Sequence, residues 1–272
     1  MKTAAGRRTP APALHRPVHP YLSRRMAWSL RGASVLITLA LWEWYGRHTN
    51  PILFTYPTAI AYAATDMLAD GTLLSALGQS LWVLAAGFTL GTLAGIALGL
   101  LGGRSPVLAG LLDIPVTALY ATPMVALVPI LVLWFGFGPS AKIVVVMLFT
   151  VFPVLINTQR GVREVDPRLV EVAHAFCSTE SRLWTDLILP SALPFVMTGI
   201  RLAIGRALIA VIVAEFYTAI AGLGYLIVSN AHAFQTARVF VPIVGLMILG
   251  VVTTGLLEMA EARIARWRPT SP

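Results

Sequence analysis

Long apolar stretches recur along this chain, and each is about as long as a membrane-spanning helix. A helix needs about 20 mostly apolar residues to cross the hydrocarbon core of a bilayer. Charged residues make up 12% of the 272 residues, whereas soluble domains carry about 25%. The sequence therefore predicts an all-α integral membrane protein that is surrounded by the lipid bilayer.

The apolar stretches predict six transmembrane helices, at residues 26–45, 73–101, 106–138, 142–157, 193–216 and 238–258. A short surface helix outside the bilayer is expected to begin at Pro57, since proline is favoured at the first position of a helix. The third span contains Pro115, Pro123 and Pro129, and a proline inside a helix leaves a backbone carbonyl without its partner. Two interpretations of these prolines stay open: kinks that help packing, or the lining of a path for solutes.

The net charge of +8 could suggest binding to nucleic acid, but the basic residues flank the apolar stretches instead of gathering on one soluble face. With the amino terminus inside, 15 of the 20 lysines and arginines fall in inner loops and tails, and 3 in outer loops. Cytoplasmic loops of membrane proteins are rich in Lys and Arg, so we expect both termini to be cytoplasmic and no nucleic-acid partner. Residues 1–25 are typical of a disordered basic tail, and residues 26–268 form the expected transmembrane domain.

Four glycines recur at every fourth position of the second span: Gly87, Gly91, Gly95 and Gly99. This spacing places all four on one face of a helix. Small residues four apart allow another helix to approach closely. We therefore expect helix packing along this face in preference to a ligand site.

A polar segment, residues 159–192, separates the fourth and fifth spans and is expected to face the cytoplasm. Asp166 followed by Pro167 predicts the start of a short helix, because aspartate caps a helix amino terminus and proline suits its first position. Thr179 or Ser178 is expected to cap a second short helix, which Pro190 ends. Two short helices at an angle should therefore lie outside the bilayer.

The first of these helices has an apolar face, formed by Leu169, Val172, Ala173 and Phe176. This face could pack on the protein's own helix ends or lie in the lipid interface, but helices of the latter kind usually have a basic polar face. Acidic and basic residues are roughly balanced in this segment. Docking into a partner protein is therefore the favoured interpretation, and the other two stay open.

The polar segment resembles the cytoplasmic EAA loop of type I ABC importer permeases, whose pattern is Glu-Ala-Ala, three residues, Gly, nine residues, Ile, one residue, Leu-Pro. The matching positions are Glu171-Val172-Ala173, Cys177, Leu187 and Leu189-Pro190. The chain departs from the pattern at Val172, Cys177 and Leu187. The departure at Cys177 matters most, because the family bends the chain there at a glycine. Three further stretches, ATPMVALVPILVLWFGFGPSAKI, GIRLAIGRALIAVIVAEF and GLGYLI, are similar to the nitrate, sulfonate and taurine branch of this family.

The resemblance implies the type I permease fold, with a permease region at about residues 70–258 and the coupling-helix loop at residues 159–192. It also implies a homodimer in the bacterial inner membrane, two ATPase subunits that bind ATP and Mg, and a periplasmic binding protein that delivers a small solute such as nitrate, a sulfonate or taurine. The residues expected to couple to the ATPase are Glu171, Ala173, Phe176, Cys177, Ser178, Leu189 and Pro190. The residues expected along the translocation path or its gate are Pro123, Pro129, Arg206 and Glu215.

The chain itself is expected to be a transport subunit and not an enzyme, with no cofactor or metal of its own. Neither Lys2 nor Lys142 follows the glycine-rich pattern of a P-loop. Arg201 and Arg206 could extend toward the membrane surface or pair with carboxylates of the loops. Glu215 could brace an outer gate, form an interhelical hydrogen bond, or relay protons in an ion-coupled secondary transporter, which is the alternative function. Six spans without an evident internal repeat favour half of a dimeric pathway over such a carrier.

Overall fold

The computed structural model of this chain describes residues 24–218 and 220–264, and every regular element within them is a helix. The predicted basic tail, residues 1–25, therefore lies almost wholly outside the described residues. The α-helices, with one 3-10 helix (η1) and one π-helical turn (η2), are α1 (Arg24–Arg47), α2 (Pro57–Ala69), α3 (Thr72–Arg104), α4 (Pro106–Ala121), η1 (Met124–Leu127), α5 (Val128–Phe135), α6 (Pro139–Arg163), α7 (Pro167–Ala175), α8 (Glu180–Arg182), η2 (Leu183–Ile188), α9 (Leu189–Thr218), α10 (Leu223–His232) and α11 (Thr236–Ile264).

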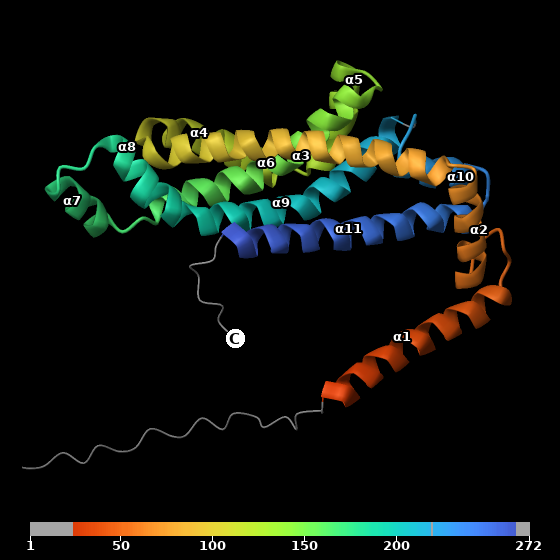
Figure 1. Ribbon diagram of the computed structural model, residues 1–272. Helices are drawn as coiled ribbons and strands as arrows, with labels where there is room; N and C mark the ends of the chain where they lie inside the picture. Colours follow the sequence, from red (N-terminus) through yellow and green to blue (C-terminus); the bar gives the residue numbers. More distant parts are fainter. Residues whose placement is uncertain (1–23, 219, 265–272) are drawn as a thin grey trace, which may run out of the picture.

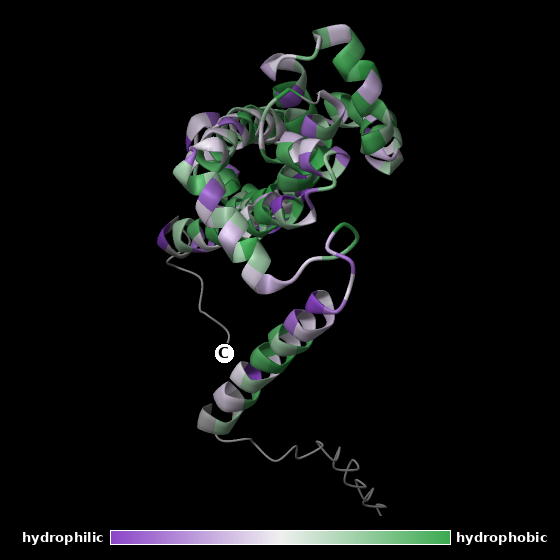
Figure 2. Cartoon of the chain, turned by 90° about the vertical axis from the view of Figure 1, so that its right-hand side faces the viewer, coloured by the Kyte–Doolittle hydropathy of each residue, from purple (hydrophilic) through white to green (hydrophobic). Residues whose placement is uncertain are grey.

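The long helices α3, α4, α6, α9 and α11 run along one another in an elongated bundle (Figure 1). α2 and α10 lie at one end of the bundle, α7 and α8 at the other, and α1 extends away from it. Apolar residues predominate on the helices of the bundle (Figure 2). The largest core cluster joins α3, α5, α6, α9 and α11. The small side chains of Ala207, Ala210 and Ala214 on α9 are 0% exposed and let α6 approach.

Within the described residues, four helical runs are long and apolar enough to cross a bilayer: α3, α6, Glu180–Thr218 and Thr236–Glu261. α4 and the segment Met124–Phe135 would together make a fifth span that bends by 92°. These five runs coincide with the second to sixth predicted spans. α1 is helical throughout the predicted first span, but it carries Arg31 and Glu43 and is not among the runs that are apolar enough. Its passage through the membrane stays a prediction.

The glycines of α3 lie where α3 packs against α6. A Cβ atom added to Gly91 would lie 2.7 Å from Thr150 Cβ, and one added to Gly95 would lie 2.8 Å from Val154 Cβ. The same close approach, at 2.6 Å, pairs Gly87 with Val146 and Gly99 with Thr158. The contacts between the two helices therefore recur every four residues. At each contact, a glycine of α3 leaves room for a β-branched side chain of α6.

Only one of the three prolines of the predicted third span breaks the helix. Pro115 lies inside α4, and Pro129 occupies the first turn of α5, where a helix has no bond for its missing N–H. The chain turns at Thr122 and Pro123, both in extended conformation (ψ 135° and 98°). A proline disfavours the helical conformation of the residue before it, so the chain bends at Thr122 and Pro123, and α5 runs across the direction of α4 (Figure 1).

The prediction that Pro190 ends the second short helix is wrong. One continuous helix runs from Glu180 to Thr218, and both Pro190 and Pro194 lie within it. Proline normally breaks a helix through its missing N–H and its contact with the preceding turn. Here Leu183–Ile188 form a π-helical turn, in which Leu189 N donates to Trp184 O. This wider turn relieves the crowding ahead of Pro190 and keeps the helix intact.

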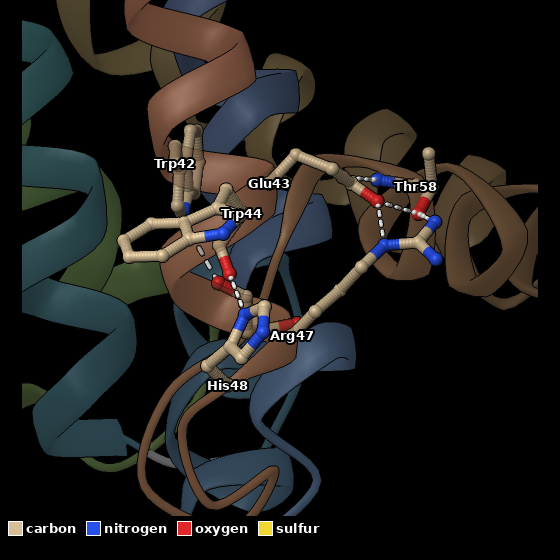
Figure 3. A network of polar contacts seen from close by, with 7 residues as sticks. Trp42, Glu43, Trp44, Arg47, His48 and Thr58 are labelled. Atoms are coloured by element: carbon tan, nitrogen blue, oxygen red, sulfur yellow. Dashed lines mark hydrogen bonds and ion pairs between the residues drawn. The ribbon is translucent and has the colours of Figure 1, made fainter.

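Glu43 of α1 closes the amino terminus of α2 (Figure 3). Its carboxylate accepts hydrogen bonds from Thr58 N (3.0 Å), Thr58 Oγ1 (2.6 Å) and Arg47 Nε (2.6 Å). The N-cap residue of α2 makes no side-chain hydrogen bond of its own, so a carboxylate from another helix supplies the cap. Trp42 Nε1 also donates to Thr55 O at 2.8 Å. These contacts fix the junction between α1 and α2.

Candidate functional site

The first short helix of the polar segment, α7, begins as the sequence predicts. Asp166 is its N-cap, and one carboxylate oxygen accepts from Arg168 N at 2.9 Å. Pro167 follows in the first turn. The helix lies at one end of the bundle, far along the molecule from α2 and α10 (Figure 1).

The apolar face of α7 is left largely uncovered by the rest of the chain. Phe176 is 82% exposed, Val172 52% and Leu169 50%. Ala173 turns inward and packs against a buried cluster that includes Leu183 and Ile188. The apolar side of the second short helix, α8 with η2, thus packs against the rest of the protein. Of the two short helices, α7 is the one with an exposed apolar face.

Cys177 holds the bend after α7 in a conformation that suits glycine. Its φ is +53°, in the left-handed region that side chains disfavour. Cys177 N donates to His174 O at 2.9 Å, and Ser178 N donates to Ala173 O at 3.0 Å. These two bonds form a Schellman motif, in which the residue at the position of Cys177 is usually glycine. The left-handed backbone conformation therefore explains why the EAA pattern has a glycine at this position. This chain keeps the same bend with a cysteine there.

The other residues expected at the coupling site lie in two places. Glu171 and Val170 of α7 border a cavity of about 330 Å³ that also touches Gly103 at the end of α3. Leu189 and Pro190 instead belong to α9 and border a separate cavity of about 630 Å³ with residues of α3. The structure thus brings Glu171, Ala173, Phe176, Cys177 and Ser178 together around α7, while the Leu-Pro pair lies in the helix that leads into the membrane.

Glu215 is fully buried near the far end of α9 and bonds across to α3. Ser80 Oγ donates to Glu215 Oε1 at 2.7 Å, and Gly224 N donates to Oε2 at 2.7 Å. Leu223 N in turn donates to Ser80 Oγ at 2.9 Å. Gly222 adopts φ +108°, and a Cβ atom there would lie 2.1 Å from Glu215 Oε1. The interhelical hydrogen bond, one of the interpretations open for Glu215, is therefore present.

The same turn is held from a second side by α6. Lys142 is 5% exposed, and its Nζ donates to Ala221 O at 2.7 Å. From the sequence, Lys142 was expected only as a charge of an outer loop and Ser80 had no expected role, although an isolated polar residue beside or within an apolar span is a recognisable signal. Together these groups fasten the turn before α10 to α3, α6 and α9.

Arg206 lies nine residues before Glu215 on α9 and meets the end of α4. Its Nη2 donates to Tyr120 Oη at 2.7 Å, and its guanidinium carbon lies 4.6 Å from the centre of the Tyr120 ring. Thr122 and Met124, on either side of Pro123, border a cavity with this pair. Pro129, in the first turn of α5, does not border this cavity. In the described part of the chain, no group of three or more His, Cys, Asp or Glu side chains could hold a metal ion.

The four spaced glycines, the proline break and the polar loop all lie within a region that matches a known protein family. Residues 87–266 match the family described as binding-protein-dependent transport system inner membrane component. The chain belongs to this family. It is therefore an ABC importer permease subunit for small solutes, which excludes the ion-coupled carrier considered as the alternative.

Two relatives show the branch of the permease. The aliphatic sulfonates transport permease protein SsuC of Escherichia coli (strain K12) is 35% identical over 259 residues, which cover 93% of this chain and 95% of that protein. The taurine transport system permease protein TauC of the same strain is 28% identical over 256 residues, which cover 90% and 91%. The permease thus belongs to the nitrate, sulfonate and taurine branch that the sequence predicts.

A solved structure supports the fold. The crystal structure of an amino acid ABC transporter with histidines aligns with a TM-score of 0.56 at 16% identity, over 75% of this permease and 97% of that chain. At this identity the likeness concerns the fold alone. It agrees with the type I permease fold expected from the sequence.

Proposed function

We propose that two copies of this permease line one translocation path, that each α7 docks into a cytoplasmic ATPase subunit that binds ATP and Mg, and that a periplasmic binding protein delivers the solute. The uncovered apolar face of α7 carries this proposal. Contiguous apolar side chains on a soluble surface usually mark a protein contact, and Phe176, at 82% exposure, stands at its edge. The positive-inside distribution of the arginines supports cytoplasmic termini and a cytoplasmic α7 in the inner membrane.

The continuous helix after α7 offers a mechanical link to the membrane. Leu183 and Ile188 are 2% and 3% exposed and hold the start of this helix against the bundle. The same helix continues without a break to Arg206 and Glu215. A movement imposed on α7 by the closing ATPase subunits would therefore tilt α9 as a rigid element, which is what alternating access between two subunits requires.

The proposed solute is a small anion of the sulfonate class. Two observations support it: the named relatives are permeases for aliphatic sulfonates and for taurine, and a guanidinium group, that of Arg206, lies uncovered on the fifth predicted span. A basic group on the path favours an anionic solute over a cationic one.

The docking role is tested with Phe176→Ser in the complex of permease, ATPase and binding protein reconstituted in liposomes. We expect loss of substrate-stimulated ATP hydrolysis by at least about 10-fold, since removing a buried aromatic anchor from an interface typically costs 2 kcal/mol or more. Phe137→Ser is the matched control, because Phe137 is also exposed, at 60%, but lies in the turn between α5 and α6. Equal ATP hydrolysis in wild type and Phe176→Ser would overturn the docking role.

A further inference from the structure

Arg206 occupies the middle of a membrane-spanning helix. α9 runs Leu189–Thr218, so Arg206 lies ~26 Å from its first residue and ~18 Å from its last, at 1.5 Å per residue. A charged side chain at that depth is costly, and it normally faces a bundle interior or a water-filled cavity. The protomer leaves Arg206 exposed, so this side chain needs an aqueous path or a second copy beside it.

Within residues 24–218 and 220–264, the charge of Arg206 has no partner carboxylate. Arg201, five residues earlier on α9, forms an ion pair with Glu261 of α11. Among the residues that the structure describes, none of the ion pairs includes Arg206. Two arginines of one helix thus differ: Arg201 is neutralised within the protein, and Arg206 is available to an external anion.

Tyr120 holds the guanidinium in place and adds a donor of its own. The Tyr120 oxygen accepts from Arg206 Nη2 at 2.7 Å, so its hydroxyl proton remains free to donate elsewhere. The ring lies under the guanidinium at 4.6 Å, an arrangement that orients the planar group and favours its charge. The pair therefore presents several N–H donors and one O–H donor to the same space.

The cavity beside this pair is small and mostly apolar. It measures about 200 Å³ and is bordered by Met124, Phe149, Phe152 and Ile209 in addition to the pair. The Thr122 hydroxyl also borders it but donates to Ala118 O at 2.8 Å. Pockets for drug-sized ligands begin at about 300 Å³, so the occupant must be smaller, with a charged head and a short apolar body.

We propose that Arg206 and Tyr120 form an anion-binding subsite that holds the sulfonate head group of a short alkanesulfonate during passage, with its alkyl chain against Phe149, Phe152 and Ile209. The guanidinium fork matches two oxygens of a tetrahedral oxyanion, and such charge-assisted bonds are about twice as strong as neutral ones. Only two polar side chains contact the anion, so it can leave again. The inference deepens the proposed function and rests on it for the direction of transport.

The subsite is tested by direct binding to the full-length permease in nanodiscs, with trifluoromethanesulfonate as the probe. The ¹⁹F signal of the probe should broaden saturably with wild type. Arg206→Gln should weaken the apparent affinity by about 10- to 100-fold, the worth of one or two hydrogen bonds to a charged group, and Tyr120→Phe by about 2- to 10-fold. Arg206→Lys should fall between wild type and Arg206→Gln, because it keeps the charge and loses the fork.

Arg201→Gln is the matched control, since it removes an arginine from the same helix whose charge is already paired. It should bind the probe within about 2-fold of wild type, as expected for a change away from the ligand. Equal broadening in wild type, Arg206→Gln and Tyr120→Phe would overturn the subsite. If Arg206→Gln does not fold, Tyr120→Phe decides the question, because it keeps the ring and removes only the hydroxyl.

ATP-driven uptake of ethanesulfonate by the complete reconstituted transporter separates this inference from the proposed function. Saturable binding that depends on Arg206, without ATP-driven uptake by wild type, would support the subsite and contradict the proposed function. Uptake by Arg206→Gln at the wild-type rate, with binding equally unchanged, would retain the importer and contradict the subsite.

Discussion

Replacing Cys177 with glycine should stabilise the end of α7. Cys177 has φ +53°, and a side chain in the left-handed conformation costs about 1–2 kcal/mol. Glycine also gains freedom in the opened chain, which offsets about 0.4–1 kcal/mol of that relief. The net stabilisation is about 0.5–1 kcal/mol, which corresponds to about 2- to 5-fold in the equilibrium for local opening.

Hydrogen exchange of the Ser178 amide reports this opening directly. Ser178 N donates to Ala173 O across the bend, so its exchange requires the Schellman motif to open. We expect the amide of Cys177→Gly to exchange about 2- to 5-fold more slowly than in wild type. Amides of α3 should be unchanged.

Cys177→Ala is the control for this measurement, because alanine removes the thiol and keeps the Cβ atom. It should leave the exchange of Ser178 close to wild type. Equal slowing in the alanine and glycine variants would show that the thiol, and not the backbone, is responsible. Unchanged exchange in the glycine variant would refute the argument from the left-handed conformation.

Two further substitutions test the packing of the bundle. Gly95→Leu should destabilise the permease by about 1–3 kcal/mol and lower its thermal melting point in detergent, because even a Cβ atom there would lie 2.8 Å from α6. Gly110→Leu is the control and should leave the melting point unchanged, because a Cβ atom there would have nothing within 4 Å. Equal melting points of the two variants would contradict the close approach of α3 and α6. Gly222→Ala should open the turn before α10 and speed hydrogen exchange at that turn, because its Cβ atom would lie 2.1 Å from Glu215 Oε1. Gly245→Ala is the control, because a Cβ atom there would have nothing within 4 Å. Unchanged exchange in both variants would show that the Glu215 contacts do not hold the turn.

Features encoded in neighbouring residues were predictable from the sequence. Asp166 and Pro167 start α7 because a cap and a proline act within one turn. The four-residue glycine spacing also predicts one smooth helix face, although it could not name α6 as the partner. The EAA pattern located the bend at Cys177, and the family membership agrees with the function inferred from it.

Features that depend on distant contacts were not predictable in this way. Ser80 and Glu215 are 135 positions apart in sequence, and only the folded bundle shows that they bond. The passage of the helix through Pro190 depends on a π-helical turn, and no single residue signals that turn. Tyr120 was likewise missed, because its importance comes from its position against Arg206.

Photocrosslinking from the chain's single cysteine, Cys177, tests directly whether α7 docks into the ATPase subunit, because this residue is exposed beside Phe176 at the end of α7. A benzophenone maleimide attached to Cys177 in the wild-type permease, irradiated in the assembled transporter, marks whatever lies against α7. If α7 docks into the ATPase subunit, mass spectrometry should identify a covalent product between the permease and that subunit. Products with lipid or with the permease alone would contradict it.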